Sequence, residues 1–590
     1  MSVITSESRR LGYVMKTLQR LLFTLTGWFL SVTAFAAGHS LANVMPAGVI
    51  AFAETDGLGA KVHQFQKSKL FELILQSPQY QEFEKGPDYA QFMAGRKIAE
   101  TFLGMDLWTT AEKLLSGQVA LGLYPQPNKN DPQAVAILRT KDAETLEKLR
   151  GRLAPFVLLA GDTVKKEELA NGAELYTLED GVLLAAKANW LAAAQSRPLL
   201  DQAMKMLTGE PGKSVSQDAG YLKFREQMGR HDLGQAYIDL RPFRKQAGPR
   251  LGIQKKEKDG GASFFLHGIL ELAAHSSYAG LTLNMGEAGM AIKAGVEGGP
   301  ESLPEKFQWF FSDPNSPGTG NLPEVPGLLG GIAIHRNIGA WYRQREQLLA
   351  EQLLPEFDKF EGEIGNLFGG QDFGEDVLPA IGSNMTLVTA RQTFEHLDGE
   401  PGVKIPGFAL IVDLEKPQEG ADLFQLLFQT IITITNFEGK DKMRAPWILS
   451  AQAYKKHSIT FAKYTRKPQG ANLPVSANFQ PAAVLVGNKF VISSTVQLAK
   501  ALTDALERPT PKAHTNRNFN LELRPADWVP VLHDNRKQVI AQAIQKGQTI
   551  EQARWGANAA EQILKSIGLL RLSTSVGREN FTMKLEARRQ

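Results

Sequence analysis

The sequence predicts an α+β fold made of two homologous tandem copies, each a curved, mainly antiparallel sheet backed by helices. Three observations lead to this fold class. Segments of the same kind recur in the same order in residues 45–300 and 326–590. Several predicted strands alternate apolar and polar residues, as 581–585 does, which is typical of antiparallel sheets with one solvated face. Predicted helices follow pairs of strands rather than every strand, which favours α+β over a doubly wound parallel sheet.

The N-terminus has the pattern of an export signal. A basic segment precedes an apolar run from Leu21 to Ala36. The run ends on Ala34 and Ala36, the small-x-small pattern at which signal peptides are cut. Its 16 residues are fewer than the roughly 20 that a membrane-spanning helix needs. We therefore predict a signal peptide over residues 1–36, cleavage after Ala36, and a protein that is periplasmic or extracellular after cleavage.

Composition narrows the functional classes. The 590 residues are 43% hydrophobic and 22% charged, as expected of a globular chain with several domains. The net charge of +4 falls to about +1 without the predicted signal, so no nucleic-acid partner is expected. The chain has no cysteine, which excludes disulfides, thiolate metal sites and a cysteine nucleophile. Met15 stays open as an alternative start to Met1.

The two copies share an order of predicted segments. Each opens on a short apolar strand and continues with a stretch of helical periodicity. A short helix with a strand, a second strand with a helix, and a hairpin with a helix then follow in both. The matching ranges are 48–52 and 330–334, 67–102 and 341–368, 104–121 and 370–387, 134–153 and 408–434, and 182–207 and 484–506. We infer an internal duplication from this shared order.

Both copies also carry an acid-Leu-Arg-Pro motif. It contains Asp239, Arg241 and Pro242 in the first copy and Glu522, Arg524 and Pro525 in the second. Proline suits the first turn of a helix, so the motif reads as the end of a strand followed by a helix. We predict a structural role in which the two arginines form interior ion pairs. A pair of anion or partner contacts is the alternative.

Residues 301–325 join the copies. They are rich in proline and glycine, as linkers are, but they include Phe307, Trp309, Phe310 and Phe311. Large apolar side chains are usually buried, so we expect these aromatics to pin the linker against a domain. A membrane-dipping or partner-docking loop is the alternative.

A family resemblance follows from these features together. The export signal, the Pro46-Ala47-Gly48 opening, the Gly-x-Asp turn before a short helix and the paired repeats resemble a family of predicted extracytoplasmic proteins classed only as a domain of unknown function. The resemblance covers nearly the whole mature chain. It implies an exported α+β protein and transfers no catalytic residues.

Motifs with known chemistry are not found, so no catalytic, cofactor-binding or metal site is predicted. The stretch from Gly209 to Ser214 lacks the first glycine of a phosphate loop, and it reads as a helix end capped by Gly209. His267 and His275 are too widely spaced to chelate one ion alone. Asp106 and Asp372 precede short helices, where acids cap free N–H groups.

These observations predict an exported, non-catalytic envelope protein with a binding or structural role. Its partner would be an unknown protein or an apolar ligand, and a peripheral membrane contact and the oligomeric state stay open. One alternative is a carrier of lipid or another apolar ligand, because the segment 421–434 is apolar nearly all round and would be buried or line a groove. The other is an enzyme of unrecognised type, which would need convergent acids, His or Ser in one concave site, such as Asp372 with His335.

Overall fold

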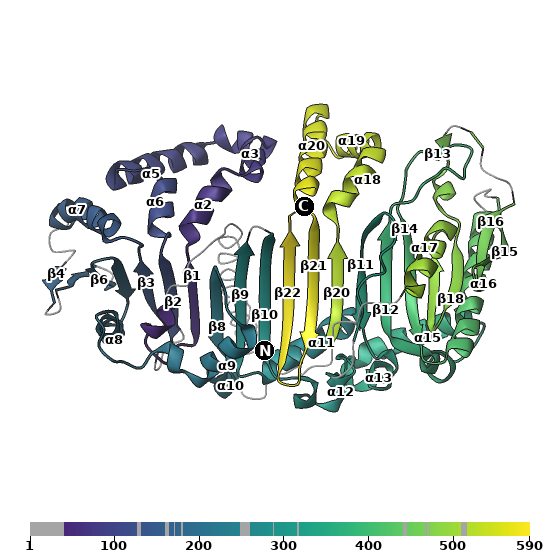
Figure 1. Ribbon diagram of the computed structural model, residues 1–590, viewed down its shortest axis with the longest axis horizontal. Helices are drawn as coiled ribbons and strands as arrows, with labels where there is room; N and C mark the ends of the chain where they lie inside the picture. The colour runs from purple at the N-terminus through teal and green to yellow at the C-terminus, as the bar shows by residue number, and fades with distance from the viewer. Residues whose placement is uncertain are drawn as a thin grey trace, which may run out of the picture. The chain divides into compact units, whose positions relative to one another are not determined.

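The protein contains both helices and antiparallel strands in quantity (Figure 1), which confirms the α+β class. The computed structural model describes residues 40–126, 131–159, 165–169, 172–178, 181–247, 260–286, 288–314, 318–440, 445–465, 469–470, 472–508 and 516–589. The predicted signal, with Ala34 and Ala36, lies outside the described residues. The chain forms two compact units: unit 1 runs to Ile238 and includes Thr282–Glu287, and unit 2 takes Asp239–Leu281 and Ala288–Gln590.

Unit 1 contains an antiparallel sheet in the strand order β8-β1-β2-β3-β7-β6-β5-β4. The strands are β1 (Ala51–Asp56), β2 (Gln118–Tyr124), β3 (Gln133–Arg139), β4 (Lys165–Glu168), β5 (Glu174–Thr177), β6 (Leu183–Lys187), β7 (Trp190–Ala194) and β8 (Gly234–Asp239). Strand β9 (Tyr278–Gly286) is divided between the two units. Short loops and hairpins join most neighbours, as expected of antiparallel pairing.

The stretch of helical periodicity expected at 67–102 is helical in unit 1 and divides into three helices. Pro78 and Pro87 each begin a new helix, because proline has no N–H to continue the preceding one. The helical elements are η1 (Leu41–Asn43), α2 (Leu58–Gln66), α3 (Lys69–Leu75), α4 (Pro78–Glu84), α5 (Pro87–Leu103), α6 (Leu107–Leu114), α7 (Ala143–Leu159), α8 (Arg197–Leu207), η3 (Val215–Gln217) and α9 (Ala219–Met228).

Unit 2 contains a longer antiparallel sheet in the order β10-β22-β21-β20-β11-β12-β14-β19-β18-β16-β15. The strands are β10 (Gly289–Glu297), β11 (Leu328–His335), β12 (Ile381–Ala390), β14 (Gly407–Leu414), β15 (Trp447–Tyr454), β16 (His457–Tyr464), β18 (Ala482–Val486), β19 (Lys489–Ser493), β20 (Arg517–Leu523), β21 (Leu569–Val576) and β22 (Asn580–Arg588). A separate parallel pair joins β13 (Glu400–Pro401) to β17 (Asn472–Leu473).

The helices of unit 2 lie between these strands in sequence. They are α10 (Arg241–Ala247), α11 (Gly260–His275), η5 (Pro300–Ser302), α12 (Glu305–Gln308), α13 (Ile338–Arg343), α14 (Arg345–Leu348), η6 (Glu351–Leu353), α15 (Leu354–Leu367), η7 (Phe373–Val377), η8 (Leu378–Ala380), α16 (Pro417–Lys440), η9 (Val475–Asn478), α17 (Val496–Glu507), η10 (Pro525–Trp528), α18 (Val529–Asp534), α19 (Arg536–Gln545) and α20 (Ile550–Ser566). Among the described residues, no helix is both long enough and apolar enough to cross a bilayer.

The aromatic residues of the predicted linker are part of the core of unit 2. Phe307, Trp309, Phe310 and Phe311 are buried in a cluster with Leu272 of α11 and with residues of β21 and β22. The buried guanidinium of Arg336 lies over the Phe310 ring, 3.6 Å from its centre, and donates to the Phe310 carbonyl at 3.2 Å. The expectation that these side chains pin the segment is confirmed, and the exposed-loop alternative is wrong.

Candidate functional site

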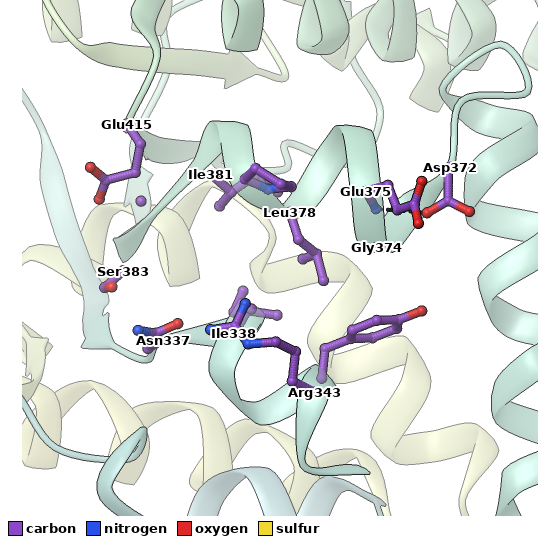
Figure 2. A pocket seen from close by; sticks show the side chains of 14 residues that line it. Asn337, Ile338, Arg343, Asp372, Gly374, Glu375, Leu378, Ile381, Ser383 and Glu415 are labelled. Carbon is purple, nitrogen blue, oxygen red and sulfur yellow. Dashed lines mark hydrogen bonds between the residues drawn. The ribbon is translucent and has the colours of Figure 1, made fainter. Parts of the chain in front are cut away.

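An open pocket of about 570 Å³ lies in unit 2 between α13 and the turns η7 and η8. Figure 2 shows Asp372 and Glu375 on one side of it and Glu415 on the other. Asp372 thus lines a concave site, as the enzyme alternative requires, but His335 is absent from the lining. The His335 ring contacts Asn384 instead, with Nδ1 3.0 Å from Oδ1. Asp372 and His335 therefore do not meet in this pocket, although Asp372, Glu375, Glu415 and Ser383 line it together.

The acids predicted to cap helices do so. Asp372 accepts the N–H of Glu375 at 2.7 Å at the start of η7. Asp106 accepts the N–H of Thr109 at 2.9 Å at the start of α6. Because both carboxylates already have a structural partner, they need no ligand to explain their positions.

The other residues singled out in the sequence also have structural roles. Gly209 follows α8 with a φ of 93° and its N–H donates to the Met206 carbonyl at 3.1 Å, so it ends the helix. His267 is buried, and the His275 ring contacts the Glu271 carbonyl at 2.9 Å. Among the described residues no His, Asp and Glu cluster has the geometry to hold a metal ion.

The repeated motif makes the same ion pair twice. Arg241 Nη2 lies 2.8 Å from Asp239 Oδ2, and Arg524 Nη2 lies 3.0 Å from Glu522 Oε1. Pro242 lies in the first turn of α10, and Pro525 begins η10. Glu522 also accepts from Arg571 of β21 at 2.7 Å. Burial acts to raise the pKa of Glu522, but the bonds from Arg571 and Arg524 hold it below its usual value.

A buried polar cluster in unit 1 was not predicted from the sequence. Glu54 of β1 accepts from Ser40 at 2.7 Å and from Gln235 of β8 at 2.6 Å. Burial raises the pKa of Glu54 despite these bonds. Burial and the neighbouring Arg225 lower the pKa of His231 to about 4. Nε2 of His231 lies 3.6 Å from Oε1 of Glu54. The cluster ties the first described residues to the sheet, and an isolated Ser or Glu in the sequence gives no signal of it.

The feature with the clearest binding character is one face of the unit 2 sheet, which we call the apolar face. Its central row runs across neighbouring strands, each residue directly opposite the next, so all the side chains are on one side. The row consists of Ile292, Leu585, Leu572, Leu521, Ile332, Leu387, Leu410 and Ile492. Leu387, Leu410 and Leu585 are 42%, 37% and 38% exposed.

The rows on either side of this central row are equally free of charge. One contains Met290, Ala587, Leu570, Leu523, Gly330, Thr389 and Phe408, and the other Ala294, Met583, Thr574, Phe519, Ile334, Met385 and Val412. No charged residue belongs to any of the three rows as the described strands define them. Leu523, Phe408 and Met583 are exposed as well. An exposed sheet face usually carries polar side chains, so this composition calls for a functional explanation.

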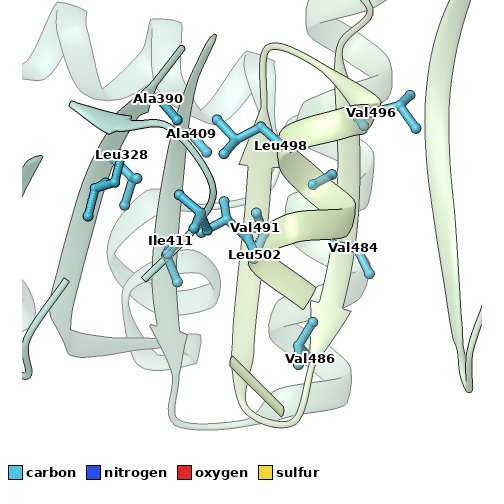
Figure 3. Close-up of a cluster of buried hydrophobic side chains, with 14 of the residues drawn as sticks. Leu328, Ala390, Ala409, Ile411, Val484, Val486, Val491, Val496, Leu498 and Leu502 are labelled. Atoms are coloured by element: carbon cyan, nitrogen blue, oxygen red, sulfur yellow. The ribbon is translucent and has the colours of Figure 1, made fainter. Parts of the chain in front are cut away.

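The opposite face of the same sheet has the reverse character. Glu522, Arg571 and Glu586 are directly opposite one another on β20, β21 and β22. Lys584 Nζ lies 2.9 Å from Glu586 Oε1. Farther along the sheet, α17 covers this second face with Leu498 and Leu502 packed among residues such as Val491 (Figure 3). The alternation at 581–585 was expected to leave only its polar side wet, yet Met583 and Leu585 are exposed too.

Two groups of helices cover the ends of the apolar face and leave its middle open. Phe424 and Phe428 of α16 pack with Val412 and Phe490 at one end. The cluster of α11 and α12 packs with Val576 and Phe581. These two residues are opposite each other and lie beside the Thr574–Met583 pair on the same face. The open part is therefore a strip between two packed layers, which suits a narrow ligand better than a flat protein surface.

The apolar segment 421–434, which was expected to be buried or to line a groove, lies in helix α16. Ala421, Phe424, Phe428 and Ile432 form a buried stripe. Ile431 and Ile434 are exposed, and Phe437 is 73% exposed. The helix is thus in the core on one side and carries exposed apolar residues on another, which is why its sequence shows no single polar face.

Unit 1 has a row of the same kind with smaller side chains. It contains Ala236, Ala53, Leu121, Ala136, Ala193 and Leu184, each opposite the next. All of these residues are partly exposed. The opposite face of this sheet holds the buried Phe52 and Tyr237. Unit 1 therefore also leaves an apolar row open, but most of its members offer a single methyl group.

Comparisons with known proteins add little to this picture. No family model matches the chain, and no curated protein matches it. Crystal forms III and IV of TP0453 are similar at 7% and 8% sequence identity, with a TM-score of 0.23 in each case. Each match covers 44% of this chain and 80% or 81% of that chain. Likeness at this level carries no argument about fold or function.

Proposed function

We propose that this is an exported, non-catalytic binding protein of the cell envelope that holds the hydrocarbon chain of a lipid, or a similar apolar ligand, on the apolar face of unit 2. One observation carries the proposal. It is the uncharged, partly exposed row from Ile292 to Ile492, which crosses the sheet without interruption. Fully burying a large aliphatic side chain contributes about 1.5–3 kcal/mol, and the partly exposed side chains of this row keep a fraction of that contribution for a ligand that covers them.

The shape and charge of the strip favour a hydrocarbon chain over other occupants. Strands are about 4.8 Å apart, so the part of the row from Ile292 to Leu410, before Ile492 packs against the α16 cluster, is roughly 29 Å long. A charged group placed over it would lose its water without gaining a partner. The packed layers formed by α16 and by the α11–α12 cluster border the strip, and a long, narrow and uncharged chain fits between them.

A non-catalytic role is supported by what the acids and histidines do. Asp372 and Asp106 cap short helices, and the His335 ring contacts Asn384. The repeated Asp239–Arg241 and Glu522–Arg524 pairs are intramolecular. Each of these side chains therefore has a structural partner within the chain. Export rests on the signal pattern at residues 1–36, and a carrier of lipid is a function that an envelope protein would need.

We also propose that the chain arose by tandem duplication, with copies at 45–300 and 326–590. In unit 1, β1 lies between β2 and β8; in unit 2, β11 lies between β12 and β20. The order continues alike through β3 and β7 in one and β14 and β19 in the other. Strand β10, the last of the first copy, pairs with β22, the last of the second, so the compact units do not follow the copy boundaries.

The proposal is tested by measuring apolar ligand binding to the mature full-length chain. We expect N-phenyl-1-naphthylamine, an uncharged fluorophore, to bind and to be displaced by a long-chain fatty alcohol. Native mass spectrometry of protein from an exported fraction should show a bound mass of several hundred daltons that organic solvent removes. Loss of residues 1–36 in the denatured mass would support the export prediction separately.

A matched pair of variants connects binding to the apolar face. Leu387→Asp with Leu410→Asp places two charges in the central row, whose side chains are already partly exposed, so folding should survive. Leu70→Asp changes an exposed leucine of α3 in unit 1 and serves as control. We expect the double variant to weaken fluorophore binding at least tenfold and the control to leave it unchanged. Equal binding by all three proteins would refute the proposed site.

A further inference from the structure

The two sheets end on strands of opposite character. In unit 1 the terminal strand β4 has the sequence Lys-Lys-Glu-Glu, and all of its residues are exposed. In unit 2 the terminal strand β15, Trp447–Tyr454, is twice as long and contains no charged residue. Charges and short length protect sheet edges from pairing with other chains. Strand β15 lacks both protections.

Strand β15 is an open edge as far as the described residues show. It pairs with β16 and with no other described strand, and Figure 1 shows it at the end of the sheet. Its connection to β16 is a two-residue turn at Lys455, which has a φ of 53°. The backbone N–H and C=O groups of β15 that do not bond to β16 therefore point to the open side of the strand.

The backbone of Trp447 identifies that outer side. Its N–H donates to Oδ1 of Asn436 on α16, and its carbonyl accepts from Nδ2 of Asn436, each at 2.8 Å. Both groups therefore point away from β16. In an antiparallel strand the direction alternates from residue to residue, so the N–H and C=O of Leu449, Ala451 and Ala453 point outward as well. These three residues are exposed, and none of the hydrogen bonds among described residues involves their outward groups.

We infer that β15 pairs with β15 of a second copy of this chain, antiparallel about a two-fold axis through Ala451. This register places Leu449 opposite the partner subunit's Ala453 and gives about six new backbone hydrogen bonds. A two-fold axis sets like residues against one another, so a charge on the edge would face its own copy. The uncharged sequence of β15 and its small central residues avoid that repulsion.

Helix α16 supplies apolar surface beside the same edge. Asn436 is bonded to Trp447, and its neighbour Phe437 is 73% exposed. Ile434 of α16 and Ile448 of β15 are exposed too. In the proposed register Ile448 lies opposite the partner subunit's Tyr454, so pairing of the two edges covers part of this apolar surface and adds a hydrophobic contribution to the backbone hydrogen bonds.

The test is the mass of the mature full-length chain in solution. Light scattering after gel filtration should give twice the monomer mass at micromolar concentration. Ala451→Lys should weaken the dimer at least tenfold, because the two lysines would meet at the axis. Ser458→Lys, an exposed position on β16, is the matched control and should remain dimeric. Equal melting temperatures for both variants would show that neither change disturbs the fold.

Cross-linking gives a second, independent measurement. The chain has no cysteine, so Ala451→Cys introduces a single thiol, and opposed residues across a two-fold β pair are about 5.5 Å apart at Cα. Oxidation should link Ala451→Cys into a covalent dimer and leave Ser458→Cys uncrosslinked. A wild-type chain that stays monomeric overturns the inference, and so does a dimer that Leu387→Asp with Leu410→Asp abolishes and Ala451→Lys does not.

Discussion

The sheets of the two units share a strand order but differ in the side chains that their open rows present. In unit 1 the row is mostly alanine, with Ala53, Ala136 and Ala193 as examples. In unit 2 it is leucine and isoleucine throughout. Each buried methylene contributes about 0.8 kcal/mol. Under the proposed function, unit 2 would therefore hold an apolar ligand more strongly than unit 1, through side-chain size alone.

The largest effect should be the loss of ligand affinity when aspartates are placed in the apolar row of each unit in turn. Leu387→Asp with Leu410→Asp in unit 2 should reduce affinity for N-phenyl-1-naphthylamine at least tenfold, because each removes a large apolar contact. Leu121→Asp with Ala136→Asp in unit 1 should reduce it less than threefold. Fluorescence titration of the full chain measures both. A larger loss from the unit 1 variant would reverse the assignment of the site.

A buried histidine of unit 1, His231, should make the stability of the protein depend on pH. Burial and Arg225 lower the pKa of His231 in unit 1 to about 4, from an ordinary value of 6.5. The unfolded chain therefore takes up the proton first as pH falls, and stability present above pH 6.5 is lost toward pH 4. The loss should reach about 3 kcal/mol.

Urea denaturation between pH 7 and pH 4.5 measures this loss. His231→Asn should flatten the pH dependence relative to wild type. His533→Asn, at a largely exposed ring in unit 2, should retain the wild-type slope. If His231→Asn keeps that slope too, His231 does not control it.

A smaller effect should distinguish the two faces of the unit 2 sheet. Arg571→Met removes a bond of 2.7 Å to the buried Glu522 on the polar face, and hydrogen bonds to charged groups contribute about 2 kcal/mol. Because the pKa of Glu522 is lowered, this stability is present above pH 4.5 and is lost as the carboxylate is protonated at lower pH. Urea midpoints at pH 7 and pH 3.5 should show a large difference from wild type at the first and a smaller one at the second. Ligand binding should not change.

The smallest loss of stability is expected from removing the two helix caps. Asp106→Ala in unit 1 and Asp372→Ala in unit 2 each remove an N-cap bond, which should cost about 1 kcal/mol. Thermal denaturation should show similar decreases for both. Asp372→Asn, which keeps an acceptor, should be nearly neutral. A loss of ligand binding in Asp372→Ala without loss of stability would instead give the pocket in Figure 2 a functional role.

Local signals in the sequence predicted local structure well. Aspartates before short helices became caps, Gly209 ended a helix, and the acid-Leu-Arg-Pro motif became an ion pair at a strand end. These features depend on residues a few positions apart, so their chemistry is visible in sequence. The helical periodicity predicted at 67–102 was confirmed, and Pro78 and Pro87 divide the segment into three helices.

Contacts between distant segments were not accessible in the same way. Nothing near Ser40, Glu54 or Gln235 in sequence indicates that they form one buried cluster. An interior ion pair was predicted for Arg524, and it pairs with Glu522; its second bond, to Glu324 at 2.6 Å, spans 200 residues and was not predicted. Such pairs depend on the tertiary fold, since the chain between them carries no local pattern that encodes their distance.

The amino-acid sequence alone was enough to predict the α+β class and the alternation of apolar and polar residues along strands such as 581–585, and it contains no recognisable catalytic motif. Which side of each strand stays open depends on the packing of distant segments. Alternation with a period of two says that two faces differ, but register and the placement of helices decide which face is covered. The apolar row exists because the strand registers, from β10 to β19 in the order of the sheet, align one leucine or isoleucine from each strand. A single strand contributes only one residue to the row, so its sequence does not reveal the row.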